Sequence, residues 1–414
     1  MGAGTQVTGL IASQPANQTS LAVDNEGRHR KCVVVTWFYP DQTGFLDFAY
    51  RIRALARHYD LTLLARAPLT QPELHIAGIE YHVLPTPNAR RVYLLPYLLR
   101  VAKWLRRHKP VRVVFLGSQL ALGSLFCPAI PSAVYWNEHP THFYPSQHTY
   151  SLVRAYCWLG RFLTYLGARS ASLVLPIGEA QQEDLLLHGC NPAQVRLQYM
   201  GVDASFVLPP AAPQGVSARQ PLRLIYVGSI SPARGRDLML QALAIANRDK
   251  KIATLTLVGA TEEQERICAK LADSLGIGDA LTVVRRVAGH EVPSYLEGAD
   301  FGLCLWEDRE HWRYNPPTKL FEYLVAGLPV LASDIRTHTQ YVHHGENGFI
   351  FAYCREGLAQ AIREAWIRGD EMTVLKANAF ASGKEYLWER IEPAFIDAMD
   401  HLGHDGEDHS APHG

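Results

Sequence analysis

Short apolar runs alternate with stretches of helical spacing along the first half of the chain. Residues 32–36 and 61–64 are apolar enough for buried strands, and the helical spacing of 45–58 joins them. This succession predicts a βαβ unit. Further strands are predicted in the same half at 111–116, 133–136 and 172–176. We therefore expect a parallel sheet covered by helices.

The same alternation begins again after a proline-rich stretch. Four prolines and no periodicity from Phe206 to Pro221 predict an interdomain linker at 206–220. Strands are then predicted at 222–228, 254–259, 281–284 and 301–305. The pattern predicts an α/β protein with two Rossmann-like domains, and the cleft between them is the expected ligand site.

These patterns divide the chain into two domains with flanking segments. The N-terminal domain is predicted at 31–205 and the C-terminal domain at 221–380. A helix at 381–402 is predicted to pack back on the N-terminal domain. The polar composition of 1–30 and 403–414 predicts disorder there.

Composition narrows the class of protein and its compartment. The chain has 414 residues, of which 48% are hydrophobic and 19% charged, and Lys plus Arg equals Asp plus Glu at 40 each. This balance gives no electrostatic case for a nucleic-acid partner. Seven scattered cysteines form no Cys-x-x-Cys pair, and no apolar run has the length of a signal-peptide core or a membrane span. We expect reduced thiols and a cytoplasmic protein.

A helix of about three turns is predicted from Asn315 to Gly327. Asn315 is suited to cap this helix, Pro316 and Pro317 to occupy its first positions, and Gly327 to end it. A short buried strand is expected to follow at 330–332. The segment is thus a helix-to-strand unit of the second domain.

One face of this helix carries Thr318, Lys319 and Glu322. Lys319 is unfavourable at the positive end of the helix dipole unless an anion binds there, which favours a phosphate site. Glu322 lies one turn further on, where a carboxylate accepts two hydrogen bonds from a vicinal diol such as a ribose. The alternative is an ordinary amphipathic helix with a local Lys319–Glu322 pair.

A glycine-containing turn follows the strand predicted at 222–228. Gly228 and Gly235 would let backbone amides approach a phosphate, and Arg234 offers a forked donor to its oxygens. The turn is neither a Walker loop nor a Gly-x-Gly-x-x-Gly fingerprint, which argues against a nicotinamide oxidoreductase. The alternative is a solvent-exposed arginine in a loop.

Polar side chains also follow the strand predicted at 133–136. Glu138 and His139 stand at its carboxyl end, where parallel sheets hold their ligands. A purely structural histidine at the end of a strand is the alternative for His139.

The segment 90–112 interleaves basic and apolar residues. This pattern is typical of a helix on an anionic membrane surface, and also of a helix that covers a sheet with its charged face in water. The membrane interpretation would favour a lipid-linked saccharide as substrate and a peripheral place at the inner face of the membrane.

The order of these motifs resembles that of the GT-B glycosyltransferases of family 4, also called glycosyl transferases group 1. The segments similar to family motifs follow one another at 177–179, 199–203, 227–235, 298–300, 315–334 and 345–350. The resemblance implies a GT-B fold, two Rossmann-like domains with parallel sheets facing across a cleft. It also implies an enzyme of polysaccharide biosynthesis that moves a sugar from a nucleotide-diphosphate-sugar donor to a glycan or lipid-linked saccharide acceptor, with retention of configuration and without a metal or other cofactor.

The resemblance also implies roles for individual residues. The N-terminal domain would bind the acceptor and the C-terminal domain the donor. Arg234 and Lys319 would contact the pyrophosphate, and Glu322 would bind the ribose as the second glutamate of a Glu-x7-Glu signature. In the N-terminal domain, His139 would touch the donor sugar or the acceptor and Glu138 would orient the acceptor hydroxyl. Further donor-binding candidates are Asn315, Thr318, Tyr314, Gly228, Ser229 and Gly44.

Two positions depart from the family pattern. Tyr314 stands where the first signature glutamate falls, and Ser229 stands where an arginine is usual. Glu307 and Glu310 are the nearby carboxylates that would replace the lost glutamate, or they are solvated loop charges. The rival functions are a nucleotide-sugar epimerase of similar shape, which needs no acceptor, and a non-catalytic subunit that binds a nucleotide sugar.

Overall fold

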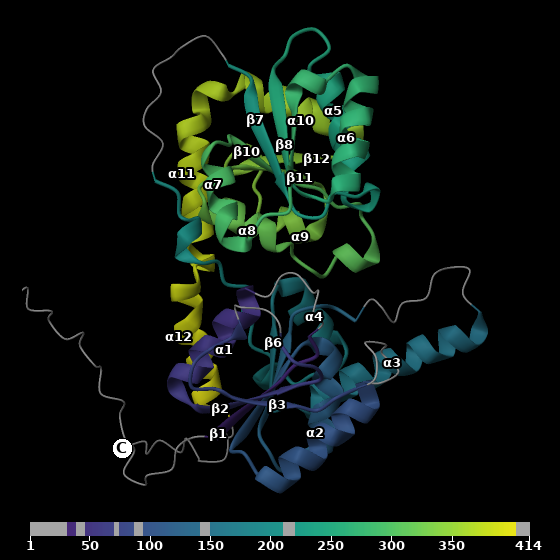
Figure 1. Cartoon of the computed structure of the whole chain (residues 1–414), viewed down its shortest axis with the longest axis vertical. Helices are drawn as coiled ribbons and strands as arrows, with labels where there is room; N and C mark the ends of the chain where they lie inside the picture. Colours follow the sequence, from purple (N-terminus) through teal and green to yellow (C-terminus); the bar gives the residue numbers. More distant parts are fainter. Residues whose placement is uncertain are drawn as a thin grey trace, which may run out of the picture.

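The computed structural model describes six stretches of the chain (Figure 1), namely 31–38, 46–69, 74–86, 94–140, 150–209 and 220–402. The segments 1–30 and 403–414, the glycine Gly44 and most of the predicted linker lie outside these residues. The division at 206–220 therefore stays a prediction.

The N-terminal half forms a sheet of six parallel strands in the order β3-β2-β1-β4-β5-β6. The strands are β1 (Lys31–Val35), β2 (Asp60–Ala65), β3 (Glu80–Val83), β4 (Arg112–Leu116), β5 (Ser132–Trp136) and β6 (Leu173–Pro176). The helices are α1 (Leu46–His58), α2 (Leu94–His108), the 3-10 helix η3 (Ser118–Phe126), α3 (Ser151–Ser170) and α4 (Glu179–Leu187).

The second half forms another sheet of six parallel strands in the order β12-β11-β10-β7-β8-β9. The strands are β7 (Leu222–Val227), β8 (Ala253–Ala260), β9 (Leu281–Arg285), β10 (Phe301–Cys304), β11 (Val330–Ser333) and β12 (Gly348–Phe351). The helices are α5 (Arg236–Ala246), α6 (Glu262–Leu275), α7 (Val292–Glu297), α8 (Thr318–Val325), α9 (Arg336–Thr339), α10 (Arg355–Ile367), α11 (Met372–Gly383) and α12 (Trp388–Asp400). Single 3-10 turns are η5 (Pro192–Gln194), η6 (Ala204–Phe206), η7 (Pro232–Arg234), η8 (Gly278–Ala280), η9 (Gly289–Glu291), η10 (Glu310–Trp312), η11 (Gly369–Glu371) and η12 (Lys384–Tyr386).

Both sheets follow one plan. Counted from its own first strand, each has the doubly wound order 3-2-1-4-5-6, in which the direction of winding reverses between the first and fourth strands. Those strands are β1 and β4 in the N-terminal sheet, and β7 and β10 in the C-terminal sheet. Sheets of this kind bind ligands outside the carboxyl ends of the strands at the reversal. The predicted fold class is confirmed.

The strands that sequence patterning missed are β3 and β12. The strand β3 reads Glu-Tyr-His-Val at the sheet edge and is largely exposed, so it lacks the apolar run of a buried strand. The strand β12 is only four residues long and begins within the predicted glycine motif at 345–350.

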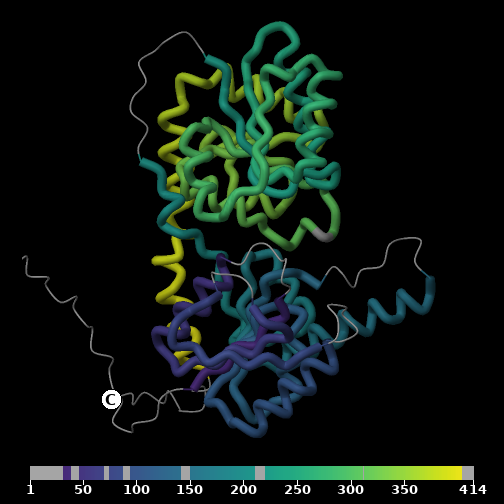
Figure 2. The backbone as a smooth tube through the Cα atoms, viewed as in Figure 1, coloured from purple at the N-terminus to yellow at the C-terminus, as the bar shows by residue number. Residues whose placement is uncertain are grey.

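The chain crosses between the two halves at two places that lie side by side (Figure 2). Val202 N donates to Tyr386 O and Trp388 N donates to Val202 O, both at 2.8 Å. Helix α12 then packs against α1, with the Tyr59 hydroxyl 2.5 Å from the Asp400 carboxylate. Among the helices of the described residues, none is both long and apolar enough to cross a membrane.

Candidate functional site

The carboxyl ends of β7 and β8 approach each other so closely that they require glycine. Gly228 has φ +134°, and a Cβ there would lie 2.9 Å from the Lys319 ammonium nitrogen. A Cβ at Gly259 would meet the Gly228 carbonyl oxygen at 2.5 Å. The structure therefore brings two predicted site residues, Gly228 and Lys319, into contact at the reversal point of the C-terminal sheet.

Two cationic side chains pack over aromatic rings at the carboxyl edge of the C-terminal sheet. Lys319 Nζ lies 3.8 Å from the centre of the Tyr226 ring, and Arg234 Cζ lies 4.5 Å from that of Trp312. Neither cation forms an ion pair with a described residue. Burial raises the pKa of the Cys304 thiol to about 12, and the charges of Lys319 and Arg234 oppose that shift. Both cations thus act on the end of β10, where an anion would find positive potential.

Glu322 is half-buried one turn along α8. Burial raises the pKa of its carboxyl to about 7, and the charge of Lys319 acts in the opposite direction. The carboxylate also contributes to the raised pKa of Tyr50 on α1, so it lies within electrostatic reach of the N-terminal domain. A carboxyl that titrates near neutrality and lies beside a cation is typical of a binding or catalytic site.

The start of α8 differs from the prediction. The helix begins at Thr318 and ends at Val325, two turns instead of three, and Pro317 at its N-cap makes no side-chain cap. The predicted cap by Asn315 is wrong. The Asn315 Oδ1 instead accepts hydrogen bonds from His139 N and Gln181 Nε2, both at 2.8 Å. These buried donors come from the other domain, and they hold Asn315 away from the helix.

His139 is fully buried at the end of β5. Its Nε2 lies 3.2 Å from both the Asp184 carboxylate and the Tyr165 hydroxyl, and that hydroxyl donates to Asp184 at 2.5 Å. The ring of Tyr314 stacks on the imidazole with centroids 4.0 Å apart and planes at 9°. The Tyr314 ring therefore covers the N-terminal candidate His139.

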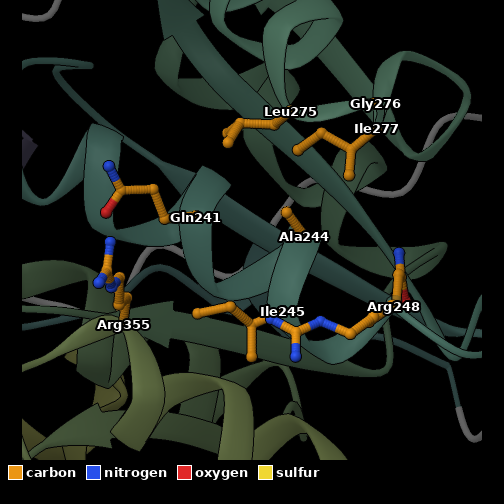
Figure 3. Close-up of a pocket in the computed structure, with 9 residues that line it drawn as sticks. Gln241, Ala244, Ile245, Arg248, Leu275, Gly276, Ile277 and Arg355 are labelled. Carbon is orange, nitrogen blue, oxygen red and sulfur yellow. The ribbon is translucent and has the colours of Figure 1, made fainter.

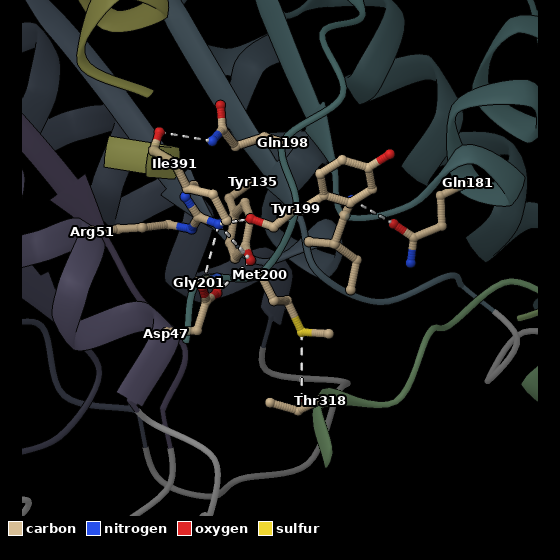
Figure 4. A network of polar contacts seen from close by, with 11 residues as sticks. Asp47, Arg51, Tyr135, Gln181, Gln198, Tyr199, Met200, Gly201, Thr318 and Ile391 are labelled. Atoms are coloured by element: carbon tan, nitrogen blue, oxygen red, sulfur yellow. Dashed lines mark hydrogen bonds and ion pairs between the residues drawn. The ribbon is translucent and has the colours of Figure 1, made fainter. Parts of the chain in front are cut away.

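The remaining predicted residues take varied positions. Glu138 and Ser229 are exposed, and the Ser229 carbonyl accepts from the Tyr226 hydroxyl at 3.2 Å. Glu307 pairs with Arg309 within its own loop. Glu310 is exposed in η10. The Thr318 hydroxyl points to Met200 Sδ at 3.5 Å (Figure 4).

A buried network holds the segment 199–201, which lies next to Thr318 of α8 (Figure 4). Arg51 Nη2 donates to the Tyr199 carbonyl at 2.9 Å and to the Tyr135 hydroxyl at 3.1 Å. Asp47 pairs with Arg51 at 3.2 Å and accepts from Gly201 N at 3.1 Å. Met200, which Thr318 contacts, is thus positioned by α1 and β5.

The sequence patterns did not predict a place near the site for three buried residues, namely Asp184, Tyr165 and Arg51. They lie on ordinary helical patterns, and their partners are distant in the chain. A polar residue on the buried face of an amphipathic helix was the one signal available, since buried charges are rare unless paired.

The described residues hold no cluster of three His, Cys, Asp or Glu side chains suited to a metal ion. A surface pocket of about 450 Å³ opens elsewhere in the C-terminal domain (Figure 3), and its lining includes Gln241, Arg248, Gly276 and Arg355. None of the predicted site residues borders it.

The fold defines the class of protein: two doubly wound domains joined by a double crossing, which is the GT-B architecture. Residues 212–381 match the family described as glycosyl transferases group 1.

Similar proteins agree with this assignment. The amylovoran biosynthesis glycosyltransferase AmsK of Erwinia amylovora is 25% identical over 203 residues, which are 47% of either chain. The chain thus spans about half the length of the curated relatives it matches.

Two solved structures share the fold. The Anabaena protein HepE, in complex with UDP and glucose, superposes with a TM-score of 0.70 at 16% identity over 90% of this chain and 100% of that one. Sucrose-phosphate synthase from Thermosynechococcus elongatus gives a TM-score of 0.70 at 16% identity over 91% of this chain and 100% of that one.

Proposed function

We propose that the protein is a hexosyltransferase that moves a sugar from a nucleotide-diphosphate-sugar donor to a saccharide acceptor. The observation that carries the proposal is the pair of cations, Lys319 and Arg234, at the carboxyl edge of β7 and β10. Neither cation has a carboxylate partner among the described residues. A diphosphate is the anion that two such cations beside a glycine turn would hold. The UDP and UDP-glucose complexes of HepE support a donor of this class.

The chemistry follows from the placement of positive charge. The acceptor hydroxyl oxygen bonds to the anomeric carbon while the bond from that carbon to the diphosphate oxygen breaks. Lys319 and Arg234 stabilise the charge that builds on the leaving diphosphate. The acceptor proton passes to a leaving phosphate oxygen, so attack comes from the face that the diphosphate leaves, and configuration is retained. This route requires no metal ion.

The N-terminal domain is proposed to bind the acceptor, a glycan or a lipid-linked saccharide. Asp184 and the Tyr314 ring fix the His139 ring at the end of β5, and the exposed Glu138 precedes it. The basic helix α2 in the segment 90–112 supports peripheral contact with an anionic membrane. Its inward face packs on the sheet, and its last turn carries Arg106 and Arg107.

Turnover with the variants Lys319→Ala and Glu322→Ala tests this assignment. Transfer or slow hydrolysis of a nucleotide sugar should fall by about 100-fold when Lys319 is truncated. Lys251→Ala is the matched control, because Lys251 is an exposed lysine of the same domain that pairs with Asp279. Wild-type rates in both site variants would remove these residues from the donor site.

A non-catalytic nucleotide-sugar binding subunit is the second candidate. The stacking of Tyr314 on His139 favours it, because the ring covers the imidazole. Tight nucleotide binding without turnover across donors and acceptors would support this candidate. A nucleotide-sugar epimerase would instead convert the donor in the absence of any acceptor.

A further inference from the structure

The segment between β10 and α8 carries two tryptophans that pack on each other. The rings of Trp306 and Trp312 stack with centres 4.3 Å apart and planes at 21°. Arg234 Cζ lies 4.5 Å from the centre of the Trp312 ring and 6.0 Å from that of the Trp306 ring. The guanidinium of a candidate donor-binding residue is therefore packed against two indoles from a different part of the domain.

Hydrogen bonds from β11 fix Trp306 at one end of this segment. The Ser333 hydroxyl accepts from Trp306 N at 2.9 Å and donates to Trp306 O at 2.7 Å. Ser333 is fully buried, and Trp306 is 6% exposed. One side chain at the end of β11 thus satisfies both backbone groups of Trp306, which buried backbone groups require.

Helix α9 fixes the other end of the segment, and it lies where the C-terminal domain faces the N-terminal domain (Figure 1). The Thr337 hydroxyl donates to Trp312 O at 2.7 Å. The buried ring of His338 lies 5.3 Å from the Trp306 ring. Burial lowers the pKa of His338 to about 3, and the charge of Lys319 adds to that shift. The imidazole behind the indoles is therefore neutral near pH 7.

Four charged side chains of the segment pair with one another. Glu307 pairs with Arg309, and Asp308 pairs with Arg313. No carboxylate of the described residues forms an ion pair with Arg234. The contact between the segment and this guanidinium is therefore aromatic rather than ionic.

An aromatic support suits a cation that must bind an anion. A carboxylate beside Arg234 would neutralise its charge and occupy its forked N–H donors. The face of a ring attracts the cation but leaves the donors at the edge of the guanidinium available. Lys319 has the same arrangement, with Nζ 3.8 Å from the centre of the Tyr226 ring. Both cations are thus held in place without being neutralised.

We propose that Trp312 is a positioning residue, which holds the Arg234 guanidinium in place for the donor diphosphate. This role rests on the function proposed above, since it requires that Arg234 bind the diphosphate. Fixing a flexible side chain before the ligand arrives reduces the entropy lost on binding. Trp306, Ser333 and Thr337 act one step further away, because they hold Trp312 and its segment.

A double-mutant cycle on Arg234 and Trp312 tests this role. Wild type, Arg234→Met, Trp312→Leu and the double variant are titrated by calorimetry with ADP, CDP, GDP, UDP and dTDP and with the corresponding nucleosides. Trp312→Leu should lower the preference for a diphosphate over its nucleoside at least about threefold, since the cation loses its aromatic support. The same substitution should have no further effect on that preference in Arg234→Met, because the cation that it positions is absent.

Two further variants separate positioning from a general loss of structure. Trp312→Phe keeps an aromatic face and should retain most of the preference for the diphosphate. Trp366→Leu is the matched control, because Trp366 packs against a cation elsewhere in the domain, with Lys250 Nζ 5.0 Å from its ring centre. It should leave the preference unchanged. Urea unfolding of the four proteins of the cycle measures the coupling between Arg234 and Trp312 without any ligand.

The outcomes distinguish this role from the function on which it rests. Full preference for the diphosphate in Trp312→Leu, an equal loss in Trp366→Leu, or no coupling between Arg234 and Trp312 in unfolding would overturn the role of Trp312. The same holds if Trp312→Leu lowers the preference as much in Arg234→Met as in the wild type. Binding of no diphosphate, or wild-type preference in Arg234→Met, would instead remove the diphosphate site, and the role of Trp312 with it, even where the coupling in unfolding remains.

Discussion

At the level of single residues, Glu322 and Gly228 have the properties most typical of a ligand site. Desolvation of the Glu322 carboxyl is unfavourable for folding alone, and the φ of +134° at Gly228 excludes other residue types from that position. Both features are understandable if the position binds a ligand, because ligand sites hold desolvated groups and let the backbone approach closely.

Donor affinity should depend on pH through Glu322. Its carboxyl has a pKa of about 7, and ribose hydroxyls donate to the ionised form. Affinity for a nucleotide sugar should therefore fall as pH drops below about 7. Titration calorimetry across this range should show the dependence in the wild type and a flat, weak response in Glu322→Gln. A pH dependence that persists in Glu322→Gln would assign it to another group.

Ionisation of Glu322 should favour donor binding but lower the free energy of unfolding of the protein. Burial holds the folded-state pKa of Glu322 above its ordinary value of 4.5, so ionisation destabilises the fold as pH rises from 4.5 to about 7. Urea unfolding should show Glu322→Gln gaining stability relative to the wild type over that interval. No relative gain would mean that the carboxyl is solvated in the folded protein.

Gly228→Ala should be costly in two ways. The backbone conformation disfavours any side chain, and the new Cβ would lie 2.9 Å from the Lys319 ammonium nitrogen. A loss of about 1–3 kcal/mol in the free energy of unfolding is expected, together with weaker donor binding. Gly298→Ala, where a Cβ meets nothing within 4 Å, is the control and should be close to neutral.

At the scale of elements, local patterns predicted the strands well and the ends of the helices less well. The βαβ alternation is visible because buried parallel strands are continuous apolar runs. Asn315 looked like a helix cap because a local rule fits it. The structure uses its side chain for two donors more than 130 residues away, and sequence spacing carries no record of such contacts.

The role of Asn315 can be measured through folding. Asn315→Ala would leave His139 N and Gln181 Nε2 buried without this acceptor, at a cost of about 1–3 kcal/mol. Asn191→Ala removes a true cap on the exposed turn η5 and should cost about 1 kcal/mol or less. Chemical denaturation of both variants provides the comparison. Equal, small losses would mean that the interdomain hydrogen bonds of Asn315 contribute little.

At the scale of the whole molecule, the candidate site lies where two domains meet. The Tyr341 hydroxyl donates to Glu179 at 2.6 Å and Arg336 pairs with Glu183 at 2.6 Å, so the C-terminal domain contacts α4 near the covered His139. The halves could be predicted separately from their repeated pattern. Their contact surface could not, because it is made of isolated polar residues from many elements.

Lys319 and Arg234 are proposed to form the diphosphate site of a sugar donor. Titration calorimetry with a nucleoside diphosphate and its parent nucleoside, for each common base, measures the contribution of the diphosphate to binding. One diphosphate should bind the wild type at least about tenfold tighter than its nucleoside, and Lys319→Met should lose that preference. Absence of binding by every diphosphate, or an unchanged preference in Lys319→Met, would mean that these cations do not form a diphosphate site.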